Sequence, residues 1–237
     1  MRILLIGYGK MGQAIEAIAV ERGHQIAGRV DVDNRQTFAT STPVDVAIEF
    51  THPDAAVDNI RWALENRWPV VVGTTGWYTH LPGIKTAVEQ HHGALLHASN
   101  FSLGVNLFFK LNEYLARLMN AHPDYDVALE ETHHTQKKDA PSGTAITLAE
   151  GILKEVARKK NWSLEQGHSP EDLVIRSHRV DPVPGTHVVA WTSAVDDIEI
   201  KHTAHSRHGF ALGAVVAAEW LAGKKGVFTM KDLLDQI

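Results

Sequence analysis

A glycine-rich turn between an apolar run and a helical pattern constrains the fold of this chain more than any other feature of its sequence. Arg2–Ile6 is typical of a buried strand, and Ala14, Ile15, Ile18 and Ala19 recur at helical spacing. Between them lies Gly7-Tyr8-Gly9-Lys10-Met11-Gly12, a G-x-G-x-x-G pattern. Its glycines allow a tight turn and a close approach of the backbone to a pyrophosphate at the helix start. A turn that only packs the helix on the strand is the alternative.

The first hundred residues continue this alternation of strands and helices. The apolar runs that predict strands lie at residues 2–6, 25–30, 44–50, 70–72 and 94–98. Such an order is typical of parallel strands joined by crossover helices. The sequence therefore predicts an α/β fold with a Rossmann-like, doubly wound parallel sheet, since a barrel would need more chain. Thr51-His52-Pro53-Asp54 predicts a helix start with a capping hydroxyl.

Beyond residue 100 the pattern changes to an α+β block. Helical patterns cover 102–119 and 142–160, the second capped by Ser142, and strand-like runs cover 125–130, 173–179, 186–195 and 197–204. Residues 161–172 are expected to form an exposed loop, and a helix over 207–222 is expected to return to the first sheet. We therefore expect a dinucleotide-binding domain of residues 1–101 plus 207–237, and an inserted α+β domain of residues 102–206.

Charge and composition narrow the classes of function. The chain has 23 basic and 28 acidic residues, a net charge of −5, and no basic block, which argues against a nucleic-acid-binding protein. It contains no Cys, which excludes disulfides, thiolate zinc ligands and Cys nucleophiles and fits a reducing compartment. The N-terminal apolar run is too short for a signal peptide or a membrane span. We expect a cytoplasmic protein whose unusual feature is its 15 His residues.

Candidate binding residues follow the predicted strands at their carboxyl ends, where open α/β sheets bind ligands. Asp31 ends the second strand 24 positions after Gly7 (31 − 7) and is placed to bind an adenosine ribose, with Asp33 less favoured. Two further segments occupy the equivalent position in later strands: Gly73, Thr74 and Thr75, and Ser99, Asn100, Phe101 and Ser102. A plain turn and a helix-capping segment are the respective alternatives.

The segment Glu131–Ala145 carries more chemically active side chains than any other. His133, His134 and Lys137 offer proton donors, and a helix start that contains Gly143 and Thr144 can receive an anion. This set suits a carboxylate substrate that must be protonated, and a solvated polar loop is the alternative. No metal site is expected, because neighbours on a strand point to opposite faces and no third ligand has a motif spacing.

Arg207 is a further candidate for binding a carboxylate, with a surface ion pair as the alternative. His202, His205 and His208 recur every third residue around it, but they straddle a strand end and a helix start, so the spacing predicts no ligand set. Of the six Trp residues, Trp77 alone adjoins a predicted pocket.

Five strings along the chain resemble the motifs of a known family, the 4-hydroxy-tetrahydrodipicolinate (dihydrodipicolinate) reductases of bacterial lysine and diaminopimelate synthesis. In order they are IGYGKMG, VVGTTG, SNFSLGVN, ETHHTQKKDAPSGTA and HSRHGFALGAV, and the fourth is close to diagnostic. The resemblance implies a nicotinamide-dependent oxidoreductase that forms a homotetramer, with residues 102–206 binding the substrate and mediating assembly.

The same resemblance implies the site residues. Gly7 to Gly12, Asp31, Gly73 to Thr75 and Ser99 to Ser102 would bind NADH or NADPH. His133 would exchange a proton and Lys137 would donate one, while His134, Gly143, Thr144 and Arg207 would hold the substrate.

The choice of cofactor is open, with a preference for NADH or dual use. Val32 stands where many relatives carry a basic residue, although Arg29 and Arg35 are nearby. A substrate role for Arg179 is not supported, because the usual glycine after it is missing.

Two other interpretations are open. A Rossmann dehydrogenase of a small amino or imino acid, such as an aspartate dehydrogenase, would share the first domain but would not need the His-His and Ser-Gly-Thr segments. A non-catalytic dinucleotide sensor would leave Lys137 and the paired His residues unexplained.

Overall fold

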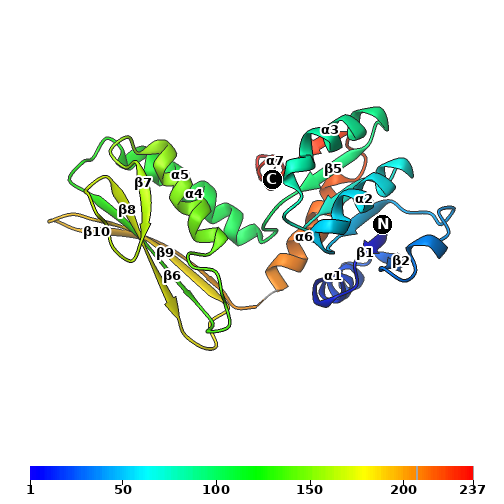
Figure 1. The fold of residues 1–237 in the computed structure, drawn as a ribbon, viewed down its shortest axis with the longest axis horizontal. Helices are drawn as coiled ribbons and strands as arrows, with labels where there is room; N and C mark the ends of the chain where they lie inside the picture. Colours follow the sequence, from blue (N-terminus) through cyan, green and yellow to red (C-terminus); the bar gives the residue numbers. More distant parts are fainter. Residues whose placement is uncertain (207, 237) are drawn as a thin grey trace. The chain divides into compact units, whose positions relative to one another are not determined.

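The computed structural model describes residues 1–206 and 208–236. The chain divides into two compact units, one of Met1–Leu103 with His208–Ile237 and the other of Gly104–Arg207. Both are drawn in Figure 1, and each is described here by itself. Among the described residues, no helix combines the length and apolar character needed to cross a membrane.

The first unit is built on a six-stranded sheet in which every pairing is parallel. Its order is β11-β5-β4-β3-β1-β2, and the strands are β1 (Arg2–Ile6), β2 (Gln25–Val30), β3 (Val46–Glu49), β4 (Val70–Val72), β5 (Ala94–His97) and β11 (Gly226–Phe228). The predicted doubly wound parallel sheet is confirmed. The sixth strand, β11, was not predicted, because three residues carry too little pattern to identify a strand.

Helices cover both faces of this sheet (Figure 1). One core contains side chains of α1 (Lys10–Glu21) and α6 (His208–Leu221), and the other contains those of α2 (Pro53–Glu65) and α3 (Leu81–Gln90). The remaining helical segments are η1 (Arg35–Thr37), η2 (Tyr78–His80) and α7 (Met230–Leu234). The helix near the C-terminus thus returns to the first sheet, as its small apolar residues predict.

The second unit is a mixed five-stranded sheet with helices on one face. Its order is β10-β9-β6-β8-β7, with β6 (Asp126–His133), β7 (Asn161–Leu164), β8 (Asp172–Arg179), β9 (Gly185–Thr192) and β10 (Asp197–Ala204). Figure 1 shows α4 (Leu103–Met119) and α5 (Gly143–Glu155) side by side along this sheet. Their apolar side chains and alternate strand residues, among them Leu129, Ile175 and Trp191, form its core.

Four details of the sequence prediction were wrong. The helix predicted to reach residue 160 ends at Glu155, where the buried ammonium of Lys159 then donates to the carbonyls of Pro170 and Asp172 at 2.9 Å each. The predicted loop begins with β7, which pairs with β8. The strand predicted to end at residue 130 runs on to 133. Thr51 does not cap α2, since its hydroxyl donates to Glu49 instead.

One close contact inside the first unit gives a stability prediction. A Cβ atom added at Gly213 would lie 1.7 Å from the carbonyl oxygen of Phe101, whereas one added at Gly209 in the same helix would first meet Ser102 Oγ at 3.6 Å. Gly213→Ala is therefore expected to lower the free energy of unfolding by about 1 to 3 kcal/mol. Gly209→Ala should leave the melting temperature unchanged or slightly raised. Thermal melts of both variants test this, and equal melting temperatures would contradict it.

Candidate active site

The glycine loop has the geometry of an anion-binding helix start. Gly7 has a φ of +92°, and a Cβ atom there would lie 2.1 Å from the carbonyl oxygen of Phe50. A Cβ atom at Gly12 would lie 2.4 Å from the carbonyl oxygen of Gly7, whereas one at Gly9 would meet nothing within 4 Å. Gly9 is also the N-cap of α1 and supplies no capping side chain. The start of α1 therefore has no capping side chain and has room beside Gly9, which fits a pyrophosphate.

A cavity of about 850 Å³ lies beside this loop. Its lining includes Gly7, Tyr8, Gly9 and Asp31, four of the residues predicted to bind a cofactor. Lys10 is exposed, and Met11 packs against the core on the α1 side of the sheet. The volume and a mostly apolar lining with a few polar groups suit the adenosine half of a dinucleotide.

Asp31 follows the last residue of β2, and its Oδ1 accepts the N–H of Val32 at 2.9 Å. Asp33 is not part of the described cavity lining. Of the two acids considered from sequence, Asp31 is therefore the one at the cavity.

The two nearby arginines differ in their surroundings. Arg29 forms a two-pronged ion pair with Glu16 and lies 5.4 Å from the ring centroid of Tyr8. Arg35 lines the cavity, lies 5.2 Å from the Trp62 ring centroid, and donates to Asn59 Oδ1 at 3.1 Å. A cation at the cavity is thus supplied by Arg35, whereas Arg29 is held by Glu16.

The loop after β4 is braced from inside the protein. The Thr74 hydroxyl accepts the Thr51 N–H at 2.7 Å, and the buried indole of Trp77 donates to the Thr74 carbonyl at 2.8 Å. A Cβ atom at Gly73 would lie 2.1 Å from the Phe50 ring. Thr75 is exposed. Trp77 therefore supports this loop from within the core and is not among the lining residues of the described cavity.

The segment after β5 presents backbone and small polar groups. The N–H of Ser102 donates to Asn100 Oδ1 at 2.9 Å, and Ser99 is exposed. The ring of Phe101 is only 2% exposed and packs in the core, 5.7 Å from the Phe50 ring. Phe101 can therefore reach a ligand through its backbone but not through its ring.

Sequence reasoning missed a buried acid at the end of β3. Glu49 is fully buried, and burial raises its pKa against the opposing hydrogen bonds from Thr51, Thr74 and Asn59. Its Oε1 accepts the Thr51 hydroxyl and, at 3.4 Å, the Asn59 amide. The sequence does contain a sign of this residue, because Glu49 is an acid in an otherwise apolar run. Like Asp31, it lies at the carboxyl end of a strand of the parallel sheet.

In the second unit, the predicted chemistry is collected between β6 and α5. His133 is the last residue of β6, and the N–H of Lys137 donates to the His134 carbonyl at 3.1 Å, which closes a turn. The Lys137 ammonium binds both Asp139 oxygens at 2.7 and 2.8 Å. This ion pair is the main cause that lowers the pKa of Asp139.

Helix α5 begins where the resemblance places a substrate carboxylate. Ser142 is its N-cap and accepts the N–H of Ala145 at 3.2 Å. A Cβ atom at Gly143 would meet nothing within 4 Å, and Thr144 is half-buried in the first turn. The start of this helix is open and can receive an anion.

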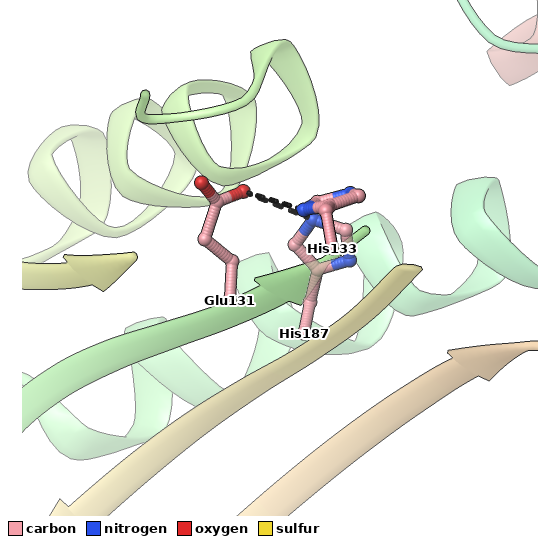
Figure 2. Close-up of side chains that lie close together, drawn as sticks. All are labelled: Glu131, His133 and His187. Carbon is pink, nitrogen blue, oxygen red and sulfur yellow. Dashed lines mark ion pairs between the residues drawn. The ribbon is translucent and has the colours of Figure 1, made fainter. Parts of the chain in front are cut away.

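Beneath this segment lies a cluster of Glu131, His133 and His187, which we call the carboxylate–imidazole cluster (Figure 2). Glu131 is fully buried, and its Oε2 lies 3.3 Å from His133 Nδ1 and 3.7 Å from His187 Nε2. The sequence prediction included His133 alone. Residues 131 and 133 share one face of β6, a spacing visible in the sequence, but Glu131 lies opposite His187 on β9, which only the strand register reveals.

Arg179 supports this region and is already engaged. Its guanidinium donates to the Asp139 carbonyl at 2.6 Å, to the Lys137 carbonyl at 3.3 Å and to Glu131 Oε1 at 3.4 Å. It therefore fixes the loop that carries Lys137.

The carboxylate–imidazole cluster is also the one group of described residues whose ligand atoms could hold a metal ion, since these atoms lie within 4.8 Å of one another. The adjacent His133 and His134, weighed as metal ligands from the sequence, are not the pair brought together here. Two features disfavour a metal ion here. The positive guanidinium of Arg179 lies next to Glu131, and His187 Nε2 is already within hydrogen-bond distance of Ser142 Oγ, at 3.1 Å.

The remaining predicted residue, Arg207, lies outside the described residues. His202 is half-buried in β10 with its ring 6.0 Å from that of Phe108, and His205 is exposed beyond the strand end. No ligand set formed by these two His residues is present among the described residues.

Two family models match this chain, one over its N-terminal part and one over the rest. A family model described as Dihydrodipicolinate reductase, N-terminus, matches residues 1–101, and the one described as Dihydrodipicolinate reductase, C-terminus, matches residues 104–234. The 4-hydroxy-tetrahydrodipicolinate reductase of Christiangramia forsetii is 48% identical over 237 residues, which cover 100% of this chain and 99% of that protein. The reductase of the same name from Methanoregula boonei is 34% identical over 95% of this chain and 94% of its own length.

Solved structures show the same fold. A dipicolinate-bound dihydrodipicolinate reductase from Paenisporosarcina sp. TG-14 has a TM-score of 0.82 at 21% identity, covering 97% of both chains. Aspartate dehydrogenase from Thermotoga maritima has a TM-score of 0.52 at 14% identity, covering 94% of this chain and 97% of that chain. Both likenesses extend to the fold alone.

The sequence matches reach both units and agree with a glycine loop suited to a dinucleotide, so a nicotinamide dinucleotide is the cofactor they imply. They confirm the resemblance first recognised in the segment that precedes α5. On this evidence, the chain belongs to the dihydrodipicolinate reductase family.

Proposed function

We propose that this chain reduces 4-hydroxy-tetrahydrodipicolinate to tetrahydrodipicolinate with NADH or NADPH, in diaminopimelate and lysine biosynthesis. One observation within the structure carries the proposal. The segment from β6 to α5 groups a buried imidazole, an ammonium and an open helix start within about a dozen residues, at the motif that matches the family.

The chemistry explains why these groups are needed together. The substrate ring carries two carboxylates, and the bound nicotinamide supplies a hydride to it. Gly143 and Thr144 at the start of α5 would hold a carboxylate together with His134 and Arg207, because the N–H groups and dipole of a helix start favour an anion. His133 and Lys137 would then supply the proton that the reduced ring requires, and their positive charge would offset the negative charge of the substrate.

The ion pair of Lys137 with Asp139 bears on this proposal. Asp139 holds the ammonium near the start of α5, and it is 59% exposed, so it can turn into solvent when a dianion arrives. The substrate then takes over as the partner of Lys137, and the positive charge becomes available for proton donation.

For the cofactor, we propose a preference for NADH with NADPH also accepted. Asp31 at the cavity suits the two hydroxyls of an unmodified ribose and repels a 2′-phosphate. Arg35 in the same cavity offsets part of that repulsion. Arg29 is held by Glu16 and contributes little.

We also propose that the second unit mediates a homotetramer in the cytoplasm. The face of its sheet opposite α4 and α5 carries small and β-branched side chains that are only half-buried: Ala128, Val174, Val188 and Ala190. Such a face suits packing against another copy of the sheet. Light scattering of the purified protein gives the oligomeric state.

The overall activity is tested with the condensation product of pyruvate and aspartate semialdehyde. The wild-type protein should oxidise NADH or NADPH in its presence, followed by the nicotinamide absorbance. If the folded protein oxidises neither NADH nor NADPH in the presence of this substrate, the proposed function is wrong.

Lys137→Ala should lower kcat by about 10²-fold or more, because the proton donor is lost. Its cofactor affinity should stay near that of the wild type, since Lys137 belongs to the second unit and the glycine loop to the first. Lys138→Ala is the matched control, with an exposed ammonium one residue away. A comparable loss of cofactor binding in Lys137→Ala would show that this residue acts elsewhere.

Asp31→Ala should weaken NADH by about tenfold, the scale of a hydrogen bond to a charged group, and should weaken NADPH less. Titration of both cofactors by protein fluorescence measures this without turnover. Asp33→Ala is the control, because Asp33 does not belong to the described lining of the cavity. Equal effects of Asp31→Ala on the two cofactors would refute the assignment.

A further inference from the structure

The carboxylate–imidazole cluster contains a second acid that the proposed mechanism does not use. We propose that Glu131 is a positioning residue that holds His133 with its ring proton on Nδ1, so that Nε2 is the nitrogen that exchanges a proton with the substrate. The inference rests on the proposed role of His133. It adds to that role a reason for the ring's orientation and tautomer.

The strand geometry places the acid where such a role requires it. Glu131 and His133 stand two residues apart on the same face of β6, and Glu131 Oε2 lies 3.3 Å from His133 Nδ1. Neither atom has another hydrogen-bond partner, although both are buried. A buried carboxylate oxygen and a buried ring nitrogen this close satisfy one another only when the nitrogen carries the proton.

The carboxylate is fixed in place by its other oxygen. Oε1 accepts the Ser142 N–H at 3.0 Å and the Ser177 hydroxyl at 2.8 Å, and the Arg179 guanidinium lies 3.4 Å away. Burial alone would raise the pKa of Glu131, but hydrogen bonds from His133, Ser142 and Ser177 outweigh it and hold that pKa below its usual range. Glu131 is therefore ionised at neutral pH and cannot rotate away without breaking these bonds.

The second imidazole does not compete for the proton. Burial, followed by the charge of His133, lowers the pKa of His187 to about 4, so His187 is neutral at neutral pH. Its Nε2 lies 3.1 Å from Ser142 Oγ, and its ring meets that of His133 edge to face at 5.1 Å. In Figure 2 both rings lie on the same side of the Glu131 carboxylate. His187 thus packs the His133 ring into position as a neutral group.

The Nε2 edge of His133 is kept clear by a glycine. A Cβ atom at Gly185, on β9, would lie 3.1 Å from His133 Nε2. Other charged and titratable groups lie around the carboxylate–imidazole cluster: Arg179 on β8 next to Glu131, His202 on β10 opposite His187, and Lys137 with Asp139 in the loop after β6.

The variant Glu131→Gln keeps the size of the side chain but changes the group that faces the His133 ring. Its amide oxygen can still accept from Ser142 and Ser177, but its NH₂ group would then face His133 Nδ1. The ring must accept at Nδ1 and carry its proton on Nε2, which is the wrong tautomer for accepting a proton there. Replacing an orienting carboxylate by its amide in this way is expected to lower kcat by about 10² to 10⁴-fold.

Nitrogen-15 NMR of the His rings reads the tautomer directly, with the His133 signals assigned by their loss in His133→Asn. We expect the neutral ring of the wild type to be protonated at Nδ1 and that of Glu131→Gln at Nε2. The matched control is Glu130→Gln, whose side chain lies on the opposite face of β6 in an exposed ion pair with Arg176. Glu131→Asp, which keeps the charge, should retain the wild-type tautomer and recover part of kcat.

The kinetic readout separates this role from a merely structural one. Glu131→Gln should lose kcat while its substrate KM, its cofactor affinity and its melting curve change little. If Glu131→Gln does not fold, the wild-type tautomer and Glu131→Asp carry the test. A wild-type His133 protonated at Nε2, or a Glu131→Gln variant with wild-type tautomer and kcat, would overturn the inference.

Two further outcomes are distinguishable. A wild-type protein without turnover would remove the proposed function, whereas the NMR experiment would still decide what Glu131 does to His133. Activity lost in EDTA and restored by Zn²⁺ would show that the cluster holds a metal, and would overturn the positioning role.

Discussion

A buried carboxylate organises the second unit. Glu131 accepts hydrogen bonds from Ser142, the N-cap of α5, and from Ser177 on β8. It also lies next to His187 on β9. An ionised acid without solvent is costly unless its partners compensate it, so these elements must come together around it. The loop that carries Lys137 is held to the same point through Arg179. The proton chemistry of the site and the packing of these elements therefore meet at one carboxyl group.

The sequence allowed prediction of what depends on local pattern. The glycine loop, the doubly wound sheet and Asp31 at the end of β2 all follow from short strings whose physical reasons lie within a few residues of each other. His133, Lys137 and the Ser142 cap were also visible in this way. These features could be predicted because a turn, a cap or a strand end imposes its own residue types.

What could not be predicted depends on register between distant segments. His187 is 56 residues from Glu131 (187 − 131), and their pairing exists only because β9 lies antiparallel to β6. Strands β7 and β11 are held by their neighbours and have weak patterns of their own. Phe101 and Trp77 looked like pocket residues because of their position, but their side chains fill the core. Composition likewise shows an excess of His without indicating that His133 and His187 lie together in the fold.

The return of the chain to the first sheet has a consequence for biosynthesis. Strand β11 and helix α6 complete one edge and one core of the first unit, yet they are made after the whole of the second unit. A chain that emerges from the ribosome residue by residue can finish the second unit while the first still lacks its last strand. Until then the edge of β5 and the apolar face awaiting α6 stay uncovered, so the first unit is the one that needs protection from aggregation during synthesis.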